Sequence, residues 1–239
     1  MKHYLHIIIA CLIILPASVW AQESYTVKSG TPLSSTFTFS DIYQYPTFTA
    51  GRVLFKNGRS GGSKMNYNLF TGEMEFIEGK DTLSLADKES IKAISIGTNA
   101  YYYQGTDGYL QRVSESAYAK LAVRKTIRLV DRQREAGYGK TSTAGVSAVN
   151  NSSLTGGNLV IVPGRALSFV SSEDLIYRKL VDYYFGNAKG FFIPAEKKNL
   201  IKAYPEKKAS INAYLKENNV DWNDEDALKN LLVIITDMK

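Results

Sequence analysis

The hydrophobic and polar positions from Tyr25 to about Asp131 alternate in short runs, which is the pattern of β-strands. These runs are rich in Tyr, Phe, Val, Ile and Thr, and turn residues separate them at short intervals. Asn57-Gly58 is a strong hairpin signal, because both residue types accept the backbone angles of a tight turn. Short neighbouring strands joined by tight turns pair antiparallel, so this region predicts an antiparallel β-meander.

The alternation predicts individual strands at residues 51–56, 65–70, 73–77, 82–86, 91–96 and 100–104. Residues 114–134 fit two structures. As a strand, this segment places Lys120, Arg124, Arg128 and Arg132 on one face, and as a helix the first three of them also form a stripe. The β-branched residues of the segment favour the strand.

The composition changes after residue 134. Residues 135–158 are rich in Gly, Ser, Thr and Asn, which predicts a flexible linker or loop. One or two more strands are expected between Leu159 and Phe169. From Ser172 the apolar period becomes that of helices, expected from Ser172 to about Phe185, after Pro194, from Pro205 to Leu215, and after Asn223, which we expect to cap the last helix.

Strands first and helices later predict an α+β fold: an antiparallel β-meander, curled into a sandwich or partial barrel, followed by a small C-terminal helical unit. The expected organisation is a β domain at residues 22–134, the linker at 135–158, and short strands then helices at 159–239.

The first 21 residues predict a secretory signal peptide. Lys2 supplies the positive charge, Tyr4 to Leu15 is a nearly unbroken apolar run, and the small side chains of Val19 and Ala21 suit cleavage after Ala21. The run is too short to cross a bilayer, and no later run reaches that length, so no transmembrane segment is expected after cleavage. We therefore expect an exported protein, periplasmic or extracellular.

Cleavage would also remove the two histidines, His3 and His6, and the single cysteine, Cys11. The remaining chain then has neither imidazole nor thiol, so we expect no metal site and no cofactor. Its formal net charge before cleavage is +6. Nucleic acid is not an expected partner of an exported protein, and Gly139-Lys140-Thr141 lacks the first glycine of a phosphate-binding loop.

Glu73 and Glu75 are the only weak catalytic candidates. On a strand they point to the same face, about 7 Å apart at the backbone, within reach of the carboxyl pairs that glycosidases use. The alternative is a solvated outer face opposite Met74 and Phe76.

The candidate binding surface is the hairpin of Asn66, Tyr67, Asn68 and Phe70 together with Tyr102, because exposed aromatic rings can stack on a ring-bearing ligand. A second candidate is the set of lysines on the C-terminal helices, which could attract an acidic polymer or anionic lipid. It comprises Lys197, Lys198, Lys202, Lys207 and Lys208. The basic row of residues 120–132 carries the same hypothesis.

Three segments resemble a recurring pattern in exported β-rich proteins of Bacteroidota-type bacteria: Gly51–Gly58 (GRVLFKNG), Lys64–Ile77 (KMNYNLFTGEMEFI) and Asp81–Ala86 (DTLSLA). Tyr138-Gly139 after a basic strand and Tyr204–Leu215 (YPEKKASINAYL) add to the resemblance. It implies the location and the architecture, and no activity.

The resulting expectation is a non-catalytic cell-envelope protein that binds a partner protein, a glycan or another ligand. The alternatives are a carboxylate-dependent hydrolase of envelope glycans, and a binder of anionic polymer or lipid surfaces through the lysine-rich helices.

Overall fold

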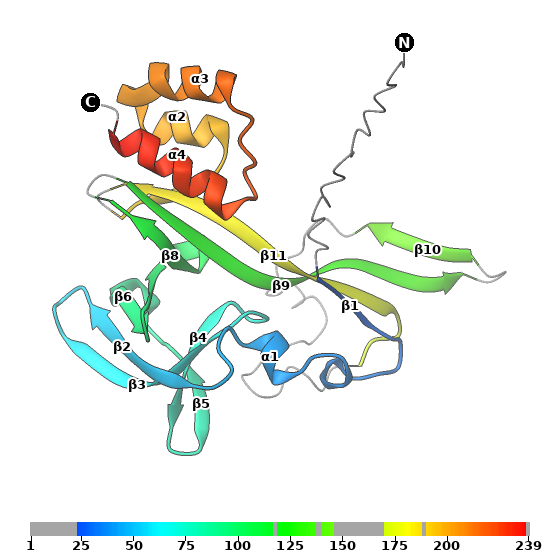
Figure 1. Ribbon diagram of the computed structural model, residues 1–239. Coiled ribbons are helices and arrows are strands. Elements are labelled where there is room, and N and C mark those ends of the chain that lie inside the picture. Colours follow the sequence, from blue (N-terminus) through cyan, green and yellow to red (C-terminus); the bar gives the residue numbers. More distant parts are fainter. Residues whose placement is uncertain (1–22, 117–118, 137–139, 146–169, 188–189, 238–239) are drawn as a thin grey trace, which may run out of the picture.

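The computed structural model describes residues 23–116, 119–136, 140–145, 170–187 and 190–237. Within them, twelve strands form one antiparallel sheet, and three helices lie together at the C-terminal end (Figure 1). The strands are β1 (Ser24–Val27), β2 (Thr49–Phe55), β3 (Ser60–Asn68), β4 (Glu73–Glu78), β5 (Asp81–Ser84), β6 (Ile91–Ile96), β7 (Asn99–Tyr103), β8 (Tyr109–Glu115), β9 (Ala119–Ala136), β10 (Lys140–Gly145), β11 (Asp174–Asn187) and β12 (Phe192–Pro194). The helices are α1 (Phe39–Ile42), α2 (Lys197–Ala203), α3 (Lys208–Glu217) and α4 (Glu225–Asp237).

The sheet has the order β1-β11-β9-β8-β7-β6-β2-β3-β4-β5, and β10 and β12 pair with β9 and β11. Consecutive strands are neighbours over most of this path, so the predicted meander and the α+β class are confirmed. The hairpin at Asn57-Gly58 also forms, with Gly58 in the left-handed region at φ 84°. The expected strands of this region all form, with ends shifted by one to a few residues.

The open sheet curls so that the end of β3 reaches the middle of β9. The Ile127 backbone N–H donates to the carbonyl oxygen of Leu69 at 2.8 Å, beyond the point where β8 has left β9. Figure 1 shows β2 to β6 lying across the long β9–β11 pair. The larger hydrophobic core lies inside this curl and contains Tyr67, Phe70 and Tyr177.

Residues 114–134 are strands, as favoured by their β-branched residues. β8 ends at Glu115 and β9 begins at Ala119, so the segment holds the end of one strand and most of the next. The helical alternative is thereby excluded for the described residues. β9 runs the length of the sheet because it pairs with β11 over Ala119 to Gln133.

The helix predicted from Ser172 to about Phe185 is wrong: Asp174–Asn187 is strand β11. Burial alternates at the start of the strand, whereas Tyr184, Phe185 and Gly186 near its end are all buried. Leu175 and Tyr177 enter the larger core, and Tyr183 and Phe185 face the C-terminal helices. Pairing with β9 along the whole strand and with β1 at its start outweighs the helical spacing of the apolar residues.

The linker predicted at residues 135–158 is also wrong in part, because Lys140–Gly145 forms β10 and pairs with β9. The Thr- and Ser-containing sequence of β10 pairs with residues 131–136 of β9, and residues 131–133 also pair with β11. The rest of that expected linker, at 137–139 and 146–158, lies outside the described residues, as do the signal peptide at 1–21 and the strands expected at 159–169.

The three C-terminal helices confirm the predicted helical unit. A second core joins them to β9 and β11 and includes Leu121, Phe185, Leu200, Ile211 and Leu228. The predicted cap of the last helix is one residue off: Asp224, not Asn223, accepts the Ala227 N–H at 2.6 Å. Side chains of β9 and β11 therefore belong to both hydrophobic cores.

Candidate functional site

A pocket of about 220 Å³ opens where the curled sheet meets β9. Four parts of the chain form its walls: the β3–β4 turn with the start of β4, Lys88 in the segment between β5 and β6, the loop before β8, and one face of β9. The lining residues are Tyr67, Phe70, Thr71, Gly72, Glu73, Lys88, Tyr103, Gly105, Thr106, Asp107, Gly108, Arg124, Thr126 and Arg128. Its volume lies below the roughly 300–1,000 Å³ of sites for drug-sized ligands, so it suits a smaller molecule.

Glycines shape two walls of this pocket. Gly72 in the β3–β4 turn has φ 73°, and Gly108 in the loop before β8 has φ 72°, both in the left-handed region that disfavours other residues. A Cβ on Gly108 would lie 4.0 Å from the carbonyl oxygen of Gly72, so the two turns approach each other closely. The meeting of these turns closes one side of the pocket.

The β9 wall presents Arg124, Thr126 and Arg128, which share a face because successive side chains alternate along a strand. Arg124 is held in place. Its Nη2 lies 2.8 Å from Asp182 Oδ2, its Nη1 donates to the Asp107 carbonyl oxygen at 3.0 Å, and its guanidinium lies 5.5 Å from the Tyr184 ring centre. These contacts satisfy Arg124 internally.

Arg128 differs from Arg124. It is half-buried in the pocket wall, and within the described part of the chain it forms no ion pair or hydrogen bond. Its pairing partner on β11 is Arg178, another cation, which cannot neutralise the charge of Arg128. A guanidinium that is partly shielded from water and lacks an internal partner offers its planar donors to a carboxylate or similar anion.

Glu73 and Lys88 form the opposite wall. Lys88 Nζ lies 2.6 Å from Glu73 Oε1, and both side chains are about 30% exposed. Glu73 Oε2 is buried and has no hydrogen-bond partner among the described residues. Thr126 is 7% exposed, and its Oγ1 likewise lacks a partner there. Both atoms have almost no accessible surface, so they lie behind the pocket wall and do not face the pocket interior.

The hairpin residues expected to form an exposed binding surface lie in the interior instead. Asn66, Tyr67, Asn68 and Phe70 are each at most 5% exposed. Tyr67 and Phe70 belong to the core and line the pocket floor, while Asn66 and Asn68 bind the backbone. The open stacking platform is therefore not formed by these four residues.

Asn68 holds the turn that forms a pocket wall. Its Oδ1 accepts the N–H groups of Phe70 and Thr71 at 2.9 and 3.0 Å, and its Nδ2 donates to Glu75 Oε1 at 3.0 Å. Asx side chains that bind the backbone in this way stabilise tight turns. The NYN segment is thus structural, and its contribution to the pocket is to position the β3–β4 turn.

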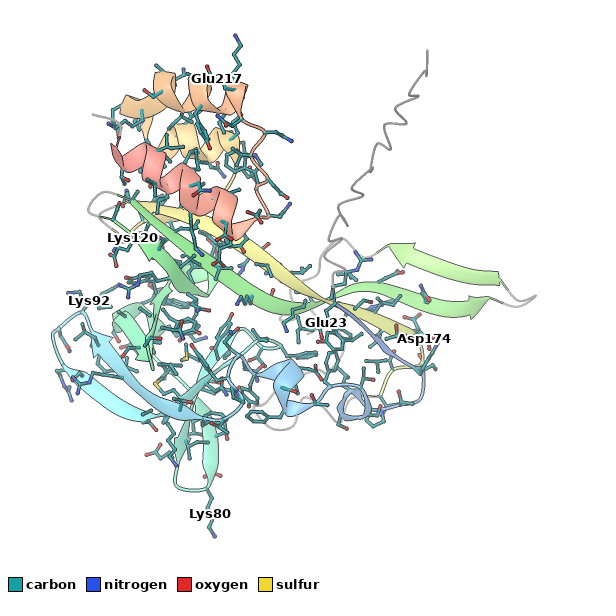
Figure 2. All side chains as sticks on the ribbon, viewed as in Figure 1. Glu23, Lys80, Lys92, Lys120, Asp174 and Glu217 are labelled. Carbon is teal, nitrogen blue, oxygen red and sulfur yellow. The ribbon has the colours of Figure 1, made fainter. Side chains whose placement is uncertain are left out.

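Tyr102 is partly buried against Phe192, with ring centres 5.5 Å apart, and lies outside the pocket. Lys120 Nζ lies 5.1 Å from the Tyr102 ring centre and 2.8 Å from Glu115 Oε1. Lys120 and Asp174 mark opposite ends of the β9–β11 pair (Figure 2). Two members of the basic row on β9, Lys120 and Arg124, therefore bind side chains or backbone of the protein itself.

Glu75 is fully buried, so the interpretation of Glu73 and Glu75 as a solvated outer face is wrong. Tyr43 donates to Glu75 Oε2 at 2.6 Å, and Asn68 donates to Oε1. Tyr43 comes from the segment after α1, which folds over β3 and β4 and covers this carboxyl. Glu73 pairs with Lys88 instead, so the two glutamates have different surroundings.

Glu75→Gln is expected to change how stability depends on pH. Burial raises the pKa of Glu75 above its ordinary value. A raised pKa favours the folded state most below the unfolded pKa, and that contribution is lost as the pH rises through the folded pKa. Gln carries no charge; its amide oxygen can accept from Asn68, and its NH2 group can donate to the Tyr43 hydroxyl oxygen, which reverses that bond. The free energy of unfolding of Glu75→Gln, relative to that of the wild type, should therefore increase as the pH rises. The increase should be at most about 1.4 kcal/mol per pH unit.

Urea unfolding of both proteins between about pH 4 and pH 8 measures this difference. Glu78→Gln, at the exposed end of the same strand, is the matched control and should follow the wild type. A constant difference between Glu75→Gln and the wild type across this range would contradict the prediction.

The lysines Lys197, Lys198 and Lys202 are exposed on α2. Lys198 pairs with Glu196 at 3.0 Å. Lys197 borders a second, shallower pocket of about 280 Å³ beside Lys216 and Trp222. The side chains there are solvent-exposed apart from Leu215, Val220 and Trp222, so this surface lacks the buried polar atoms found in the first pocket.

Sequence reasoning identified Tyr67, Phe70, Glu73, Arg124 and Arg128 among the lining residues, and missed Lys88, Asp107 and Thr126. The spacing of Arg124, Thr126 and Arg128 on a strand was the available signal for Thr126. No helix in the described ranges is long and apolar enough to cross a membrane, and no described group of His, Cys, Asp or Glu is arranged to hold a metal ion. Comparisons with family models, curated proteins and solved structures found no match to this chain.

Proposed function

We propose that this chain is an exported binding protein whose pocket on β9 holds a small ligand with an acidic group. The observation that carries this proposal is Arg128, a half-buried cation in the pocket wall without a partner in the described residues. Desolvation of a cation costs free energy, and an anionic ligand offsets that cost on binding. The proposal requires recognition only and no chemical step.

The surroundings of Arg128 support a preformed site. Arg124 is fixed by Asp182 and Asp107, and Lys88 is fixed by Glu73, so neither has to reorganise for the ligand. Charged and polar groups that are already positioned lower the entropic cost of binding. Three cations and two carboxylates line the pocket, which favours a ligand of negative charge.

The test is binding of matched acids and neutral compounds: benzoate against benzamide, and cyclohexanecarboxylate against cyclohexanecarboxamide, followed by ligand-observed NMR. We expect the acids to bind and the amides to bind much more weakly. Arg128→Gln should weaken acid binding about 10- to 100-fold, the range for loss of a hydrogen bond to a charged group.

Arg112→Gln is the matched control, because it removes the same charge from a side chain on β8 that pairs with Glu115 outside the pocket. It should bind the acids as the wild type does. Equal binding of acids and amides, or equal effects of the two substitutions, would refute the proposed function.

Export rests on the signal-like segment at residues 1–21, with Lys2, its apolar run and the cleavage position after Ala21. We expect the intact mass of the protein recovered from the periplasm or medium of a bacterial host to correspond to a chain beginning at Gln22. Full-length protein retained in the cytoplasm would contradict export and leave the pocket proposal unaffected.

A further inference from the structure

Arg128 is one half of a cross-strand pair of arginines. In the register of β9 with β11 it lies directly opposite Arg178, and Figure 1 shows the two long strands side by side. Residues directly opposite each other in an antiparallel pair point to the same face of the sheet, with Cβ atoms about 5 Å apart. Arg178 therefore lies beside Arg128 on the face that Arg128 presents to the pocket.

No acid neutralises this pair within the described part of the chain. Arg178 is exposed, and neither its guanidinium nor that of Arg128 forms an ion pair or a hydrogen bond there. On β1 the residue opposite Arg178 is Ser24, so the row across the three strands contains no carboxylate. Like charges directly opposite each other destabilise a sheet, and an anion bound between them removes that cost.

The acids closest along the three strands have other partners. Asp182, four residues further along β11, lies 2.8 Å from Arg124 Nη2. Glu23, just before β1, lies 3.3 Å from Lys179 Nζ. Asp131, the next acid along β9, accepts a backbone N–H at 2.8 Å and a side-chain amide at 3.4 Å. The two charges of the arginine pair are therefore left for a ligand.

Two neighbouring guanidinium groups fit an anion with two negative charges better than an anion with one. A carboxylate carries one charge on two oxygens, whereas a phosphate monoester carries about −1.5 to −2 at pH 7 on three acceptor oxygens. Arginine binds phosphate through two parallel N–H donors, so one phosphate can accept bonds from both side chains. The pocket of about 220 Å³ leaves room for a small organic group beside it.

We infer that the ligand is a small phosphate monoester whose phosphate bridges Arg128 and Arg178 at the edge of the pocket. This inference rests on the proposed function, because both require the anion position at Arg128. It adds the second negative charge as the feature that the site selects, and Arg178 as the residue that selects it.

The experiment compares phenyl phosphate, benzenesulfonate and benzoate by isothermal titration calorimetry at about pH 8, where phosphate monoesters are doubly charged. All three carry the same ring. The sulfonate keeps three oxygens with a single charge, and benzoate has two oxygens with a single charge. We expect phenyl phosphate to bind about tenfold or more tightly than either of the others, as expected for added hydrogen bonds between charged groups.

Arg178→Gln supplies the residue-level test. Arg178 is exposed, so folding should be retained. The affinity for phenyl phosphate should fall about tenfold or more, while the affinity for benzoate changes less than about threefold. Arg128→Gln should weaken both. Arg52→Gln, at an exposed arginine on β2 that does not line the pocket, is the matched control and should change neither affinity.

Phosphate monoesters also occur as lipid head groups, so a second measurement identifies the source. Phosphatidylcholine vesicles that contain phosphatidic acid present the same phosphate on a membrane surface. We expect glycerol phosphate to bind in solution and these vesicles to sediment no more protein than vesicles of phosphatidylcholine alone. Sedimentation that requires both phosphatidic acid and Arg178 would overturn the soluble ester in favour of a lipid head group.

The outcomes separate this inference from the proposed function. Equal affinity for the three aromatic acids, with each dependent on Arg128, would overturn the phosphate monoester and keep an acid-binding pocket. Unchanged affinity of Arg178→Gln for phenyl phosphate would do the same. Absence of binding by every acid would overturn both proposals.

Discussion

Phe185→Ala is expected to lower the free energy of unfolding by about 3–5 kcal/mol, the range for removing a buried phenylalanine side chain. Phe185 is fully buried on β11, where it packs in the core shared with Leu200, Leu228 and Leu231. This core is the attachment of the C-terminal helices to the sheet. The substitution would leave a cavity between the two layers, which the surrounding side chains fill only partly.

Urea unfolding followed by far-UV circular dichroism measures this effect. Phe191→Ala is the matched control, because Phe191 stands just before β12 and is 63% exposed. It removes the same side chain from a nearby position without opening a cavity, so its effect should stay within about 0.5 kcal/mol. Equal effects of the two substitutions would show that the helices do not pack on β11 as described.

Asn66→Ala should cost about 3 kcal/mol or more, although it removes only a small polar side chain. Asn66 is fully buried. Its Oδ1 accepts the N–H groups of Tyr45 and Tyr67 at 3.1 and 2.9 Å, and its Nδ2 donates to the carbonyl oxygens of Tyr45 and Thr47 at 2.8 and 3.3 Å. Each buried backbone group left without a partner costs about 1–3 kcal/mol.

The contrast is Asn57→Ala, which also removes an asparagine bound to the backbone. Asn57 is exposed in the β2–β3 turn and accepts a single bond, from the Arg59 N–H at 3.0 Å. Water replaces that bond, so we expect a cost below about 1 kcal/mol. Thermal unfolding of both variants gives the comparison, and a mild effect at Asn66 would mean that the segment Tyr45–Thr47 is not held to the sheet by this side chain.

The hairpins from β2 to β7 could be predicted because their information is local. Asn57-Gly58 fixes a turn, and the alternation on either side fixes which residues face the core. The same reasoning failed for β11, because the side chains at its two ends pack in different hydrophobic cores. Leu175 and Tyr177 serve one core while Phe185 serves another, and the apolar residues between them mimic a helical spacing.

The candidate site could be predicted only in part. The basic row on β9 was visible in the sequence, but its separation into satisfied and unsatisfied cations was not. That separation depends on Asp182 and Asp107, which approach Arg124 through strand pairing and a loop, respectively. Glu75 was misjudged for a similar reason, because the covering residue Tyr43 comes from a segment that folds back over the sheet.

The pairing of β1 with β11 has a consequence for how the chain is made. Lys28, just after β1, forms an ion pair at 2.7 Å with Asp174, and the two residues are 146 positions apart. During synthesis, β1 can therefore pair with β11 only after most of the polypeptide has left the ribosome. Contacts between such distant segments slow folding, so an early-stopped nascent chain would present an unfinished sheet edge to other molecules.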